Sequence, residues 1–187
     1  MNSIRHSEFN PLLRVLSIIV LGVLLVGFYR IYKFIWPTPY VATQSGFQIV
    51  FSGTPTVTKL PSQSKSGVEG GAIYSVDNQI KGTDYAVYVT DYSHVNFNSL
   101  SKNSKVQILE GEVESIVKSD KVSLTSGQAI TFDNLTAVEA TLTPPNTSEP
   151  DTHLVAFFNK TRLYILLGAG ISTSKFNSYT KTFRFRN

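Results

Sequence analysis

An apolar segment near the N-terminus constrains this chain more than any other feature. Residues 15–29 (VLSIIVLGVLLVGFY) contain no charged side chain, and apolar residues extend this segment from Leu12 to Trp36. A helix rises about 1.5 Å per residue and the hydrocarbon core of a bilayer is about 30 Å thick, so roughly 20 such residues span it. The sequence therefore predicts one transmembrane anchor over residues 12–36, preceded by an N-terminal tail of residues 1–11.

The flanks of this segment distinguish an uncleaved anchor from a cleaved signal peptide. A signal peptide ends in small residues at its cleavage site, whereas residues 30–37 (RIYKFIWP) are bulky and basic. Aromatic side chains at the end of a span are suited to the lipid headgroup region. The residues that represent the predicted anchor are Val15, Leu21, Leu25, Tyr29 and Trp36.

The charges beside the span do not settle its orientation. Arg5 and Arg14 precede it and Arg30 and Lys33 follow it, so the positive-inside rule gives a tie. Short N-terminal tails usually stay in the cytoplasm when the apolar segment acts as a signal anchor. We therefore expect a single-pass protein of the cell membrane, with its C-terminal domain on the extracytoplasmic side.

Composition limits the partners and the chemistry. The chain has a formal charge of +4, but from Pro37 onward thirteen Lys and Arg stand against twelve Asp and Glu, a net charge of +1. A nucleic-acid binder carries a basic stripe or face, so we expect no nucleic-acid partner. The chain has no cysteine, which excludes disulfides, thiolate metal sites and cysteine nucleophiles.

Most of the chain beyond the span has the pattern of β-strands. A stiff spacer is expected over residues 37–46, followed by one domain over residues 47–187. Apolar and polar side chains alternate most clearly in residues 84–91 (DYAVYVTD), as in a strand with one buried face. Turns are expected at Asp133–Asn134 and at Asn159–Lys160. Further strands are predicted over residues 47–52, 57–60, 72–76, 113–124, 128–142, 154–158 and 163–167.

Two segments have the period of a helix instead. Residues 98–109 place apolar side chains four positions apart, with Asn98 or Ser99 as the cap and Gly111 as the end of the helix. A second helix is predicted over residues 172–182. The expected fold class is therefore α+β, a mainly antiparallel sheet with helices packed on it, preceded by one transmembrane helix.

The order of these elements resembles the PsbP/DcrB-type domain, which many bacterial membrane-anchored proteins of unknown function carry. The residues that carry the resemblance are Phe47 to Pro55, Tyr85 to Tyr92, Ala156 to Leu167 and Lys175 to Phe185. The resemblance implies an α/β sandwich outside the cytoplasmic membrane. It also implies an accessory or assembly role, as in the extrinsic subunits of photosystem II, rather than catalysis.

One group of side chains has the composition of a hydrolase triad. Asp91, Ser93 and His94 place a carboxylate, a hydroxyl and an imidazole within four residues. A triad needs a base within about 3 Å of an exposed nucleophile and a separate oxyanion hole, and near neighbours in sequence rarely meet that geometry. We favour a turn at the end of a strand in which Asp91 accepts hydrogen bonds from backbone N–H groups.

Two other patterns invite a ligand. Glu110, Glu112 and Glu114 would share one face of a strand, either as a weak Ca²⁺ or Mg²⁺ site or as a charged sheet edge, and we favour the edge. Gly168 and Gly170 precede the second helix, as in a phosphate loop. They lack the Lys-Ser/Thr of that motif, so a strand-to-helix turn capped by Ser172 or Thr173 is the better interpretation.

The sequence thus predicts a non-enzymatic binding domain, with no catalytic, cofactor-binding or metal-binding residues and no cofactor. We expect it to contact another membrane or extracytoplasmic protein, with Tyr74, Tyr88 and Tyr92 as a possible binding surface. The alternative is a small apolar or lipid-like ligand in a pocket between sheet and helix. The residues expected to line such a pocket are Tyr85, Val87, Ile165 and Leu167.

Overall fold

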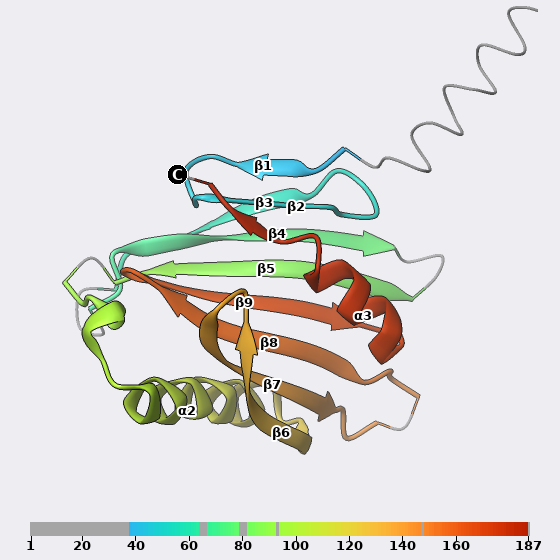
Figure 1. The fold of residues 1–187 in the computed structure, drawn as a ribbon. Coiled ribbons are helices and arrows are strands. Elements are labelled where there is room, and N and C mark those ends of the chain that lie inside the picture. Colours follow the sequence, from blue (N-terminus) through green and yellow to red (C-terminus); the bar gives the residue numbers. More distant parts are fainter. Residues whose placement is uncertain (1–37, 64–66, 79–81, 93, 147, 187) are drawn as a thin grey trace, which may run out of the picture. The chain divides into compact units, whose positions relative to one another are not determined.

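The computed structural model describes residues 38–63, 67–78, 82–92, 94–146 and 148–186, and those from Pro39 onward belong to one compact unit (Figure 1). The predicted tail and the predicted anchor over residues 12–36 lie outside the described residues. Within the described residues, no helix combines the length and the apolarity needed to cross a membrane.

The described residues form two antiparallel sheets. The larger has seven strands in the order β3-β4-β5-β9-β8-β7-β6, and the smaller has three in the order β1-β2-β10. The strands are β1 (Tyr40–Ala42), β2 (Phe47–Ile49), β3 (Thr56–Leu60), β4 (Gly70–Asn78), β5 (Thr83–Asp91), β6 (Ser123–Phe132), β7 (Leu135–Thr143), β8 (Thr152–Asn159), β9 (Arg162–Ala169) and β10 (Arg184–Phe185). This architecture confirms the prediction of a mainly antiparallel sheet with helices packed on it.

A hydrophobic core lies on each face of the seven-stranded sheet. The first core lies between one face of this sheet and the three-stranded sheet together with helix α3 (Thr173–Thr180). The second lies under helix α2 (Lys102–Asp120) and the short 3₁₀-helix η2 (Phe97–Ser99). Because side chains alternate along a strand, Val87 of β5 belongs to the first core and its neighbour Tyr88 packs against the second.

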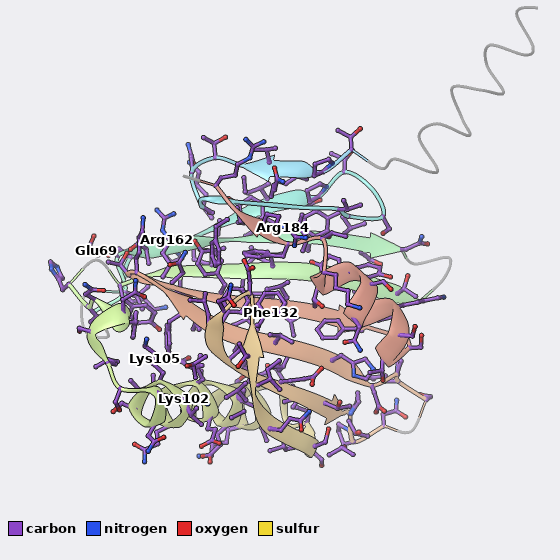
Figure 2. The ribbon with its side chains drawn as sticks, in the orientation of Figure 1. Glu69, Lys102, Lys105, Phe132, Arg162 and Arg184 are labelled. Atoms are coloured by element: carbon purple, nitrogen blue, oxygen red, sulfur yellow. The ribbon has the colours of Figure 1, made fainter. Side chains whose placement is uncertain are left out.

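Aromatic side chains hold the small sheet on the large one. Phe47 of β2 stacks on Phe183 with 5.5 Å between ring centroids and meets Tyr74 of β4 edge-on at 5.1 Å. The Tyr164 hydroxyl of β9 donates a 2.9 Å hydrogen bond to the Ser45 carbonyl in the β1–β2 turn. Phe132, at the end of β6 (Figure 2), stacks on Phe157 at 4.8 Å. The end of β6 therefore packs against the first core, through Phe132 and Ile130.

Helix α2 corrects the prediction for residues 98–124. The helix begins after Ser101, whose side chain accepts a hydrogen bond from the Ser104 N–H, and it continues through Gly111 to Asp120. Neither predicted cap residue caps it. Gly111 lies on an open side of the helix, where a Cβ would meet no neighbouring atom within 4 Å, and a glycine inside a helix costs only about 1 kcal/mol. The buried Leu109 and Val113 offset that cost.

Both predicted turns are confirmed as hairpins. Asp133 and Asn134 have φ values of 47° and 63°, and this left-handed pair joins β6 to β7. Such a pair of positive φ values is typical of the two-residue turns that match the twist of the strands. Lys160, with φ 57°, lies in the turn between β8 and β9.

The predicted spacer over residues 37–46 is partly wrong. Residues Tyr40–Ala42 form β1, which pairs with β2, and Ser45 is buried at 7% exposure. The prolines of this segment suggested an extended linker, but residues 40–42 pair with β2 and residues 43–46 form the turn between the two strands. The second helix is shorter than predicted, and Ser172 caps it by accepting a hydrogen bond from the Lys175 N–H.

Candidate functional site

The two edges of the seven-stranded sheet differ in their protection. The β3 edge has five residues, includes Lys59 and is flanked by Pro55 and Pro61. Charged residues and prolines on an edge strand discourage pairing with another chain. The β6 edge has ten residues (SLTSGQAITF) with neither a charge nor a proline, and its first seven, Ser123 to Ala129, are all exposed.

The backbone of β6 is paired on one side only. It follows β7 at the end of the strand order, and within the described residues no element pairs with its outer side. Alternate N–H and C=O groups of such a strand point outward and accept another strand. One irregularity interrupts the ladder, where the register shifts between Leu124 and Ser126, and the Thr125 hydroxyl there lies 2.6 Å from that of Thr143.

An apolar cleft lies between the end of α2 and the large sheet. It has a volume of about 290 Å³. Its apolar walls come from α2, from the segment after it and from strands β5, β7 and β9, and three polar residues complete it. The lining residues are Tyr88, Ile116, Ser119, Asp120, Val122, Leu142, Thr152, Ile165 and Leu167.

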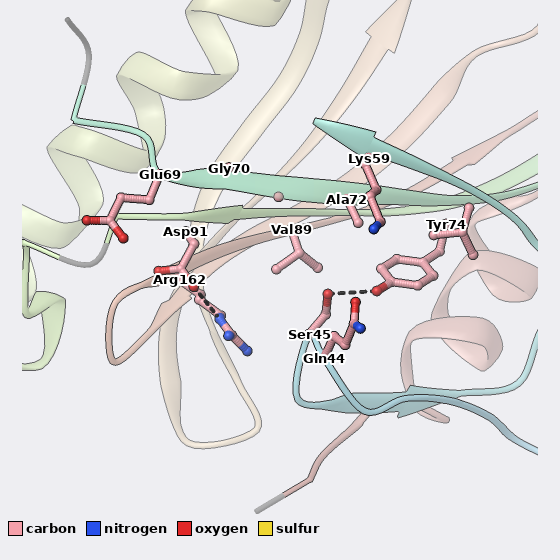
Figure 3. A pocket seen from close by; sticks show the side chains of 12 residues that line it. Gln44, Ser45, Lys59, Glu69, Gly70, Ala72, Tyr74, Val89, Asp91 and Arg162 are labelled. Carbon is pink, nitrogen blue, oxygen red and sulfur yellow. Dashed lines mark hydrogen bonds and ion pairs between the residues drawn. The ribbon is translucent and has the colours of Figure 1, made fainter. Parts of the chain in front are cut away.

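A second, polar cleft of about 370 Å³ separates the β1–β2 turn from the β3–β4 hairpin (Figure 3). In this view Ser45, Lys59 and Tyr74 point toward the same space. The Ser45 hydroxyl and the Tyr74 hydroxyl are 2.7 Å apart, and Arg162 Nε donates to Asp91 Oδ2 at 3.0 Å. Two cations, Lys59 and Arg162, and two anions, Glu69 and Asp91, line it, so its walls favour neither sign of charge.

The three tyrosines predicted as a binding surface do not lie on one surface. Tyr74 is 5% exposed and belongs to the first core. Tyr88 and Tyr92 are half-buried against the second core, on the opposite face of the sheet. This separation corrects the grouping, because strand parity places Tyr74 of β4 on one face and Tyr88 of β5 on the other. Binding of a partner by Tyr88 or Tyr92 stays a prediction.

The residues predicted to line one pocket are also divided between the two faces. Val87 pairs in register with Leu166, and Tyr88 with Ile165. Tyr85 and Val87 therefore pack in the first core, whereas Ile165 and Leu167 face α2. Of these four residues, only Ile165 and Leu167 line the cleft under α2. The position of the cleft, between sheet and helix, agrees with the predicted alternative, although half of its expected lining does not.

Asp91 and His94 of the suspected triad bind different side chains. Asp91 accepts hydrogen bonds from Arg162 Nε at 3.0 Å and from the Thr161 hydroxyl at 3.2 Å. His94 Nε2 instead lies 2.9 Å from Glu69 Oε1, with 83% of its side chain exposed, and Ser93 lies outside the described residues. The partners of Asp91 are thus side chains of β9 and its turn, not the local backbone we expected.

The three glutamates lie on helix α2, not on a strand, which corrects both interpretations of that pattern. Glu114 forms an i,i+4 ion pair with Lys118 at 3.5 Å. Glu112 is half-buried, and burial raises its carboxyl pKa even though a hydrogen bond from Tyr92 lowers it. Among the described residues, no group of three or more His, Asp or Glu could hold a metal ion.

The glycines before α3 have a steric role. Gly170 has φ 69°, and a Cβ placed there would lie 2.0 Å from the Gly82 carbonyl oxygen. A Cβ on Gly168 would lie 2.5 Å from Ile171 and 2.8 Å from Phe176. Both positions therefore require a residue without a Cβ, because Gly170 packs against the β4–β5 turn and Gly168 packs against Ile171 and α3. This agrees with the predicted strand-to-helix turn.

Comparison with known proteins supports the fold. Neither a protein-family model nor a curated protein sequence matches the chain. The chain is similar in structure to cyanobacterial PsbP (CyanoP) from Synechocystis sp. PCC 6803, whose solution structure it matches with a TM-score of 0.53. The identity is 12%, and the match covers 79% of this chain and 91% of that one. The chain therefore has a PsbP-like fold, as its resemblance to that domain implied.

Proposed function

We propose that this chain is a membrane-anchored accessory protein that binds another extracytoplasmic or membrane protein and catalyses no reaction. The observation that carries this proposal is the long β6 edge, which has neither a charge nor a proline. The rest of the sheet is covered by α2 on one face and by the small sheet and α3 on the other. The β3 edge is guarded by a lysine and two prolines, so β6 is the edge best suited to receive a strand from a partner.

Strand addition also fits the chemistry of β6. Main-chain hydrogen bonds supply affinity in this mode of recognition, and side chains on alternate positions supply specificity. The side chains of β6 are small or uncharged, and Leu124 is 48% exposed. A partner segment that is extended, uncharged and rich in β-branched residues would pair here without burying a charge.

Site-specific photocrosslinking tests this proposal on the full chain in its native membranes. A benzoylphenylalanine at Ala129 of β6 is expected to capture a discrete protein on irradiation. The same probe at Thr58 of β3 is the control, because it reports on an edge of the same sheet that is protected by charge and proline. Equal capture at both positions, or no capture at Ala129, would contradict the proposal.

The anchor and the orientation are part of the same proposal. The apolar segment over residues 12–36 supports a single-pass anchor with the domain outside. Because the natural chain has no cysteine, single cysteines report on topology without background. With Glu114→Cys, a membrane-impermeant maleimide is expected to label intact cells; with Ser3→Cys, it should label only permeabilised ones. The reverse pattern would place the domain in the cytoplasm.

A second candidate function is the binding of a small apolar or lipid-like ligand. The cleft under α2 favours it, since six of its nine lining residues are apolar and it lies between sheet and helix. Ligand sites are typically concave and mostly apolar, with a few polar groups, and have volumes of roughly 300 Å³ upward. At about 290 Å³ the cleft would hold a small molecule or one end of a larger one.

A further inference from the structure

The cleft under α2 is a local gap in an otherwise filled layer. In the middle of the helix Leu109 and Val113 are buried at 0% and 3% exposure. One turn later Ile116 is only half-buried and lines the cleft. On the sheet side Leu142 and Ile165 form a floor that is 3% and 8% exposed. An apolar body placed here would extend the second core.

One carboxylate, that of Asp120, is the charged group that lines the cleft. Asp120 is the last residue of α2, where unpaired carbonyl groups already give the helix a partial negative charge. Its Oδ1 accepts a 2.8 Å hydrogen bond from the Ser119 hydroxyl, and among the described residues it forms no ion pair. Lys118, two residues before it, is paired with Glu114 instead.

A neutral aromatic hydroxyl faces this carboxylate. Tyr88 lines the cleft, and burial, together with the charge of Asp120, raises the pKa of its phenol. The phenol therefore stays protonated at neutral pH and acts as a hydrogen-bond donor or acceptor.

We infer that the cleft binds a small amphiphilic cation, with an aliphatic body between α2 and β9 and an ammonium group at Asp120. The body would lie against Ile116, Ile165 and Leu167. This inference rests on the second candidate function above and names the ligand class for it. A carboxylate ligand of the same length would place its charge against Asp120 and the helix end.

A matched series of six-carbon probes tests the inference on the full chain in lipid nanodiscs. Hexylammonium, hexanol and hexanoate are titrated by calorimetry, and titrations of empty nanodiscs correct for partitioning into lipid. We expect hexylammonium to bind about 2- to 5-fold more tightly than hexanol, the range of an exposed ion pair. Hexanoate should bind most weakly.

Three substitutions, two on α2 and one on β9, separate the contribution of charge from that of shape. Asp120→Asn should remove the preference for the amine and leave hexanol binding unchanged. Glu110→Gln, a matched control at an exposed position of the same helix outside the cleft, should keep the preference. Leu167→Trp should fill the cleft and remove binding of hexylammonium and hexanol. If Leu167→Trp does not fold, Asp120→Asn, at an exposed position, still tests the inference.

The outcomes distinguish the inference from the function on which it rests. Hexanol binding without a preference for the amine would overturn the cationic ligand and keep an apolar pocket. If neither hexanol nor hexylammonium binds, both the cationic ligand and the apolar pocket are overturned. A preference that survives Asp120→Asn would show that the ammonium lies elsewhere, and this too would overturn the inference. Crosslinking at Ala129 is independent of all three results.

Discussion

Truncation of Val87 should destabilise the domain much more than the same truncation on the sheet edge. Val87 is 0% exposed and lies in register between Tyr74 of β4 and Leu166 of β9. Val87→Ala removes two buried methyl groups, which lowers the free energy of unfolding by about 1.5–3 kcal/mol when the cavity is included. The matched control is Val57→Ala on β3, where the valine is 45% exposed and the change should stay within about 0.5 kcal/mol.

Thermal unfolding of the detergent-solubilised full chain, followed by the near-ultraviolet circular dichroism of its tyrosines, measures both variants. For a chain of this length 1 kcal/mol shifts Tm by roughly 2–4 °C, so Val87→Ala should melt about 3–12 °C below the natural chain. Val87→Asp places a carboxylate in the same site at a cost of several kcal/mol, comparable with the total stability of about 5–15 kcal/mol. It should show no cooperative transition. Equal melting of the two alanine variants would refute the assignment of Val87 to the core.

Three further predictions follow from charges and backbone geometry. Asp84 lies opposite Asp77 in the β4–β5 ladder, and burial and this neighbour raise the pKa of Asp84. Asp84→Asn should therefore raise the free energy of unfolding at pH 7 by a few tenths of a kcal/mol, measured as a slightly higher Tm. Burial raises the pKa of Glu112 above 4.5, so its folded form binds a proton more tightly than its unfolded form. Stability should fall as the pH rises through the range just above 4.5, and a pH series of denaturant titrations should show a flatter curve for Glu112→Gln. Gly170→Ala should cost about 2 kcal/mol or more and Gly82→Ala about 1 kcal/mol in thermal melts, since both have positive φ but only the first meets a carbonyl oxygen.

Much of the sheet could be predicted from the sequence because its strands alternate strictly or end at marked turns. Residues 84–91 and the Asp133–Asn134 turn are examples, and both lie where expected. Helix α2 could not be predicted to its end, because Gly111 and the alternating glutamates after it imitate a turn and a strand. The apolar positions Leu109, Val113 and Ile116, spaced for one helix face, were the signal that could have corrected this.

The candidate sites depend on which strands are neighbours, and a sequence pattern does not give that order. Tyr74 (in AIYSV) and Tyr88 (in AVYVT) have similar neighbours in the sequence, yet strand parity buries one in the first core and turns the other toward α2. The prediction of a charged sheet edge was also wrong. Glu110, Glu112 and Glu114 were expected to lie on a strand at the edge of the sheet, whereas they lie on α2, and the edge strand β6 carries no charge. Its ten uncharged residues were visible in the sequence, but only the strand order shows that they form an edge.

The central claim, that β6 contacts a partner protein, is tested most directly by affinity purification of the full chain from its native membranes. The natural chain is compared with Ala129→Lys, which places a charge on the β6 edge, and with Asn103→Lys, which adds the same charge at an exposed position of α2. We expect a specific protein to co-purify with the natural chain and with Asn103→Lys and to be lost with Ala129→Lys. Equal recovery with both lysine variants, while both remain folded, would contradict the role of β6.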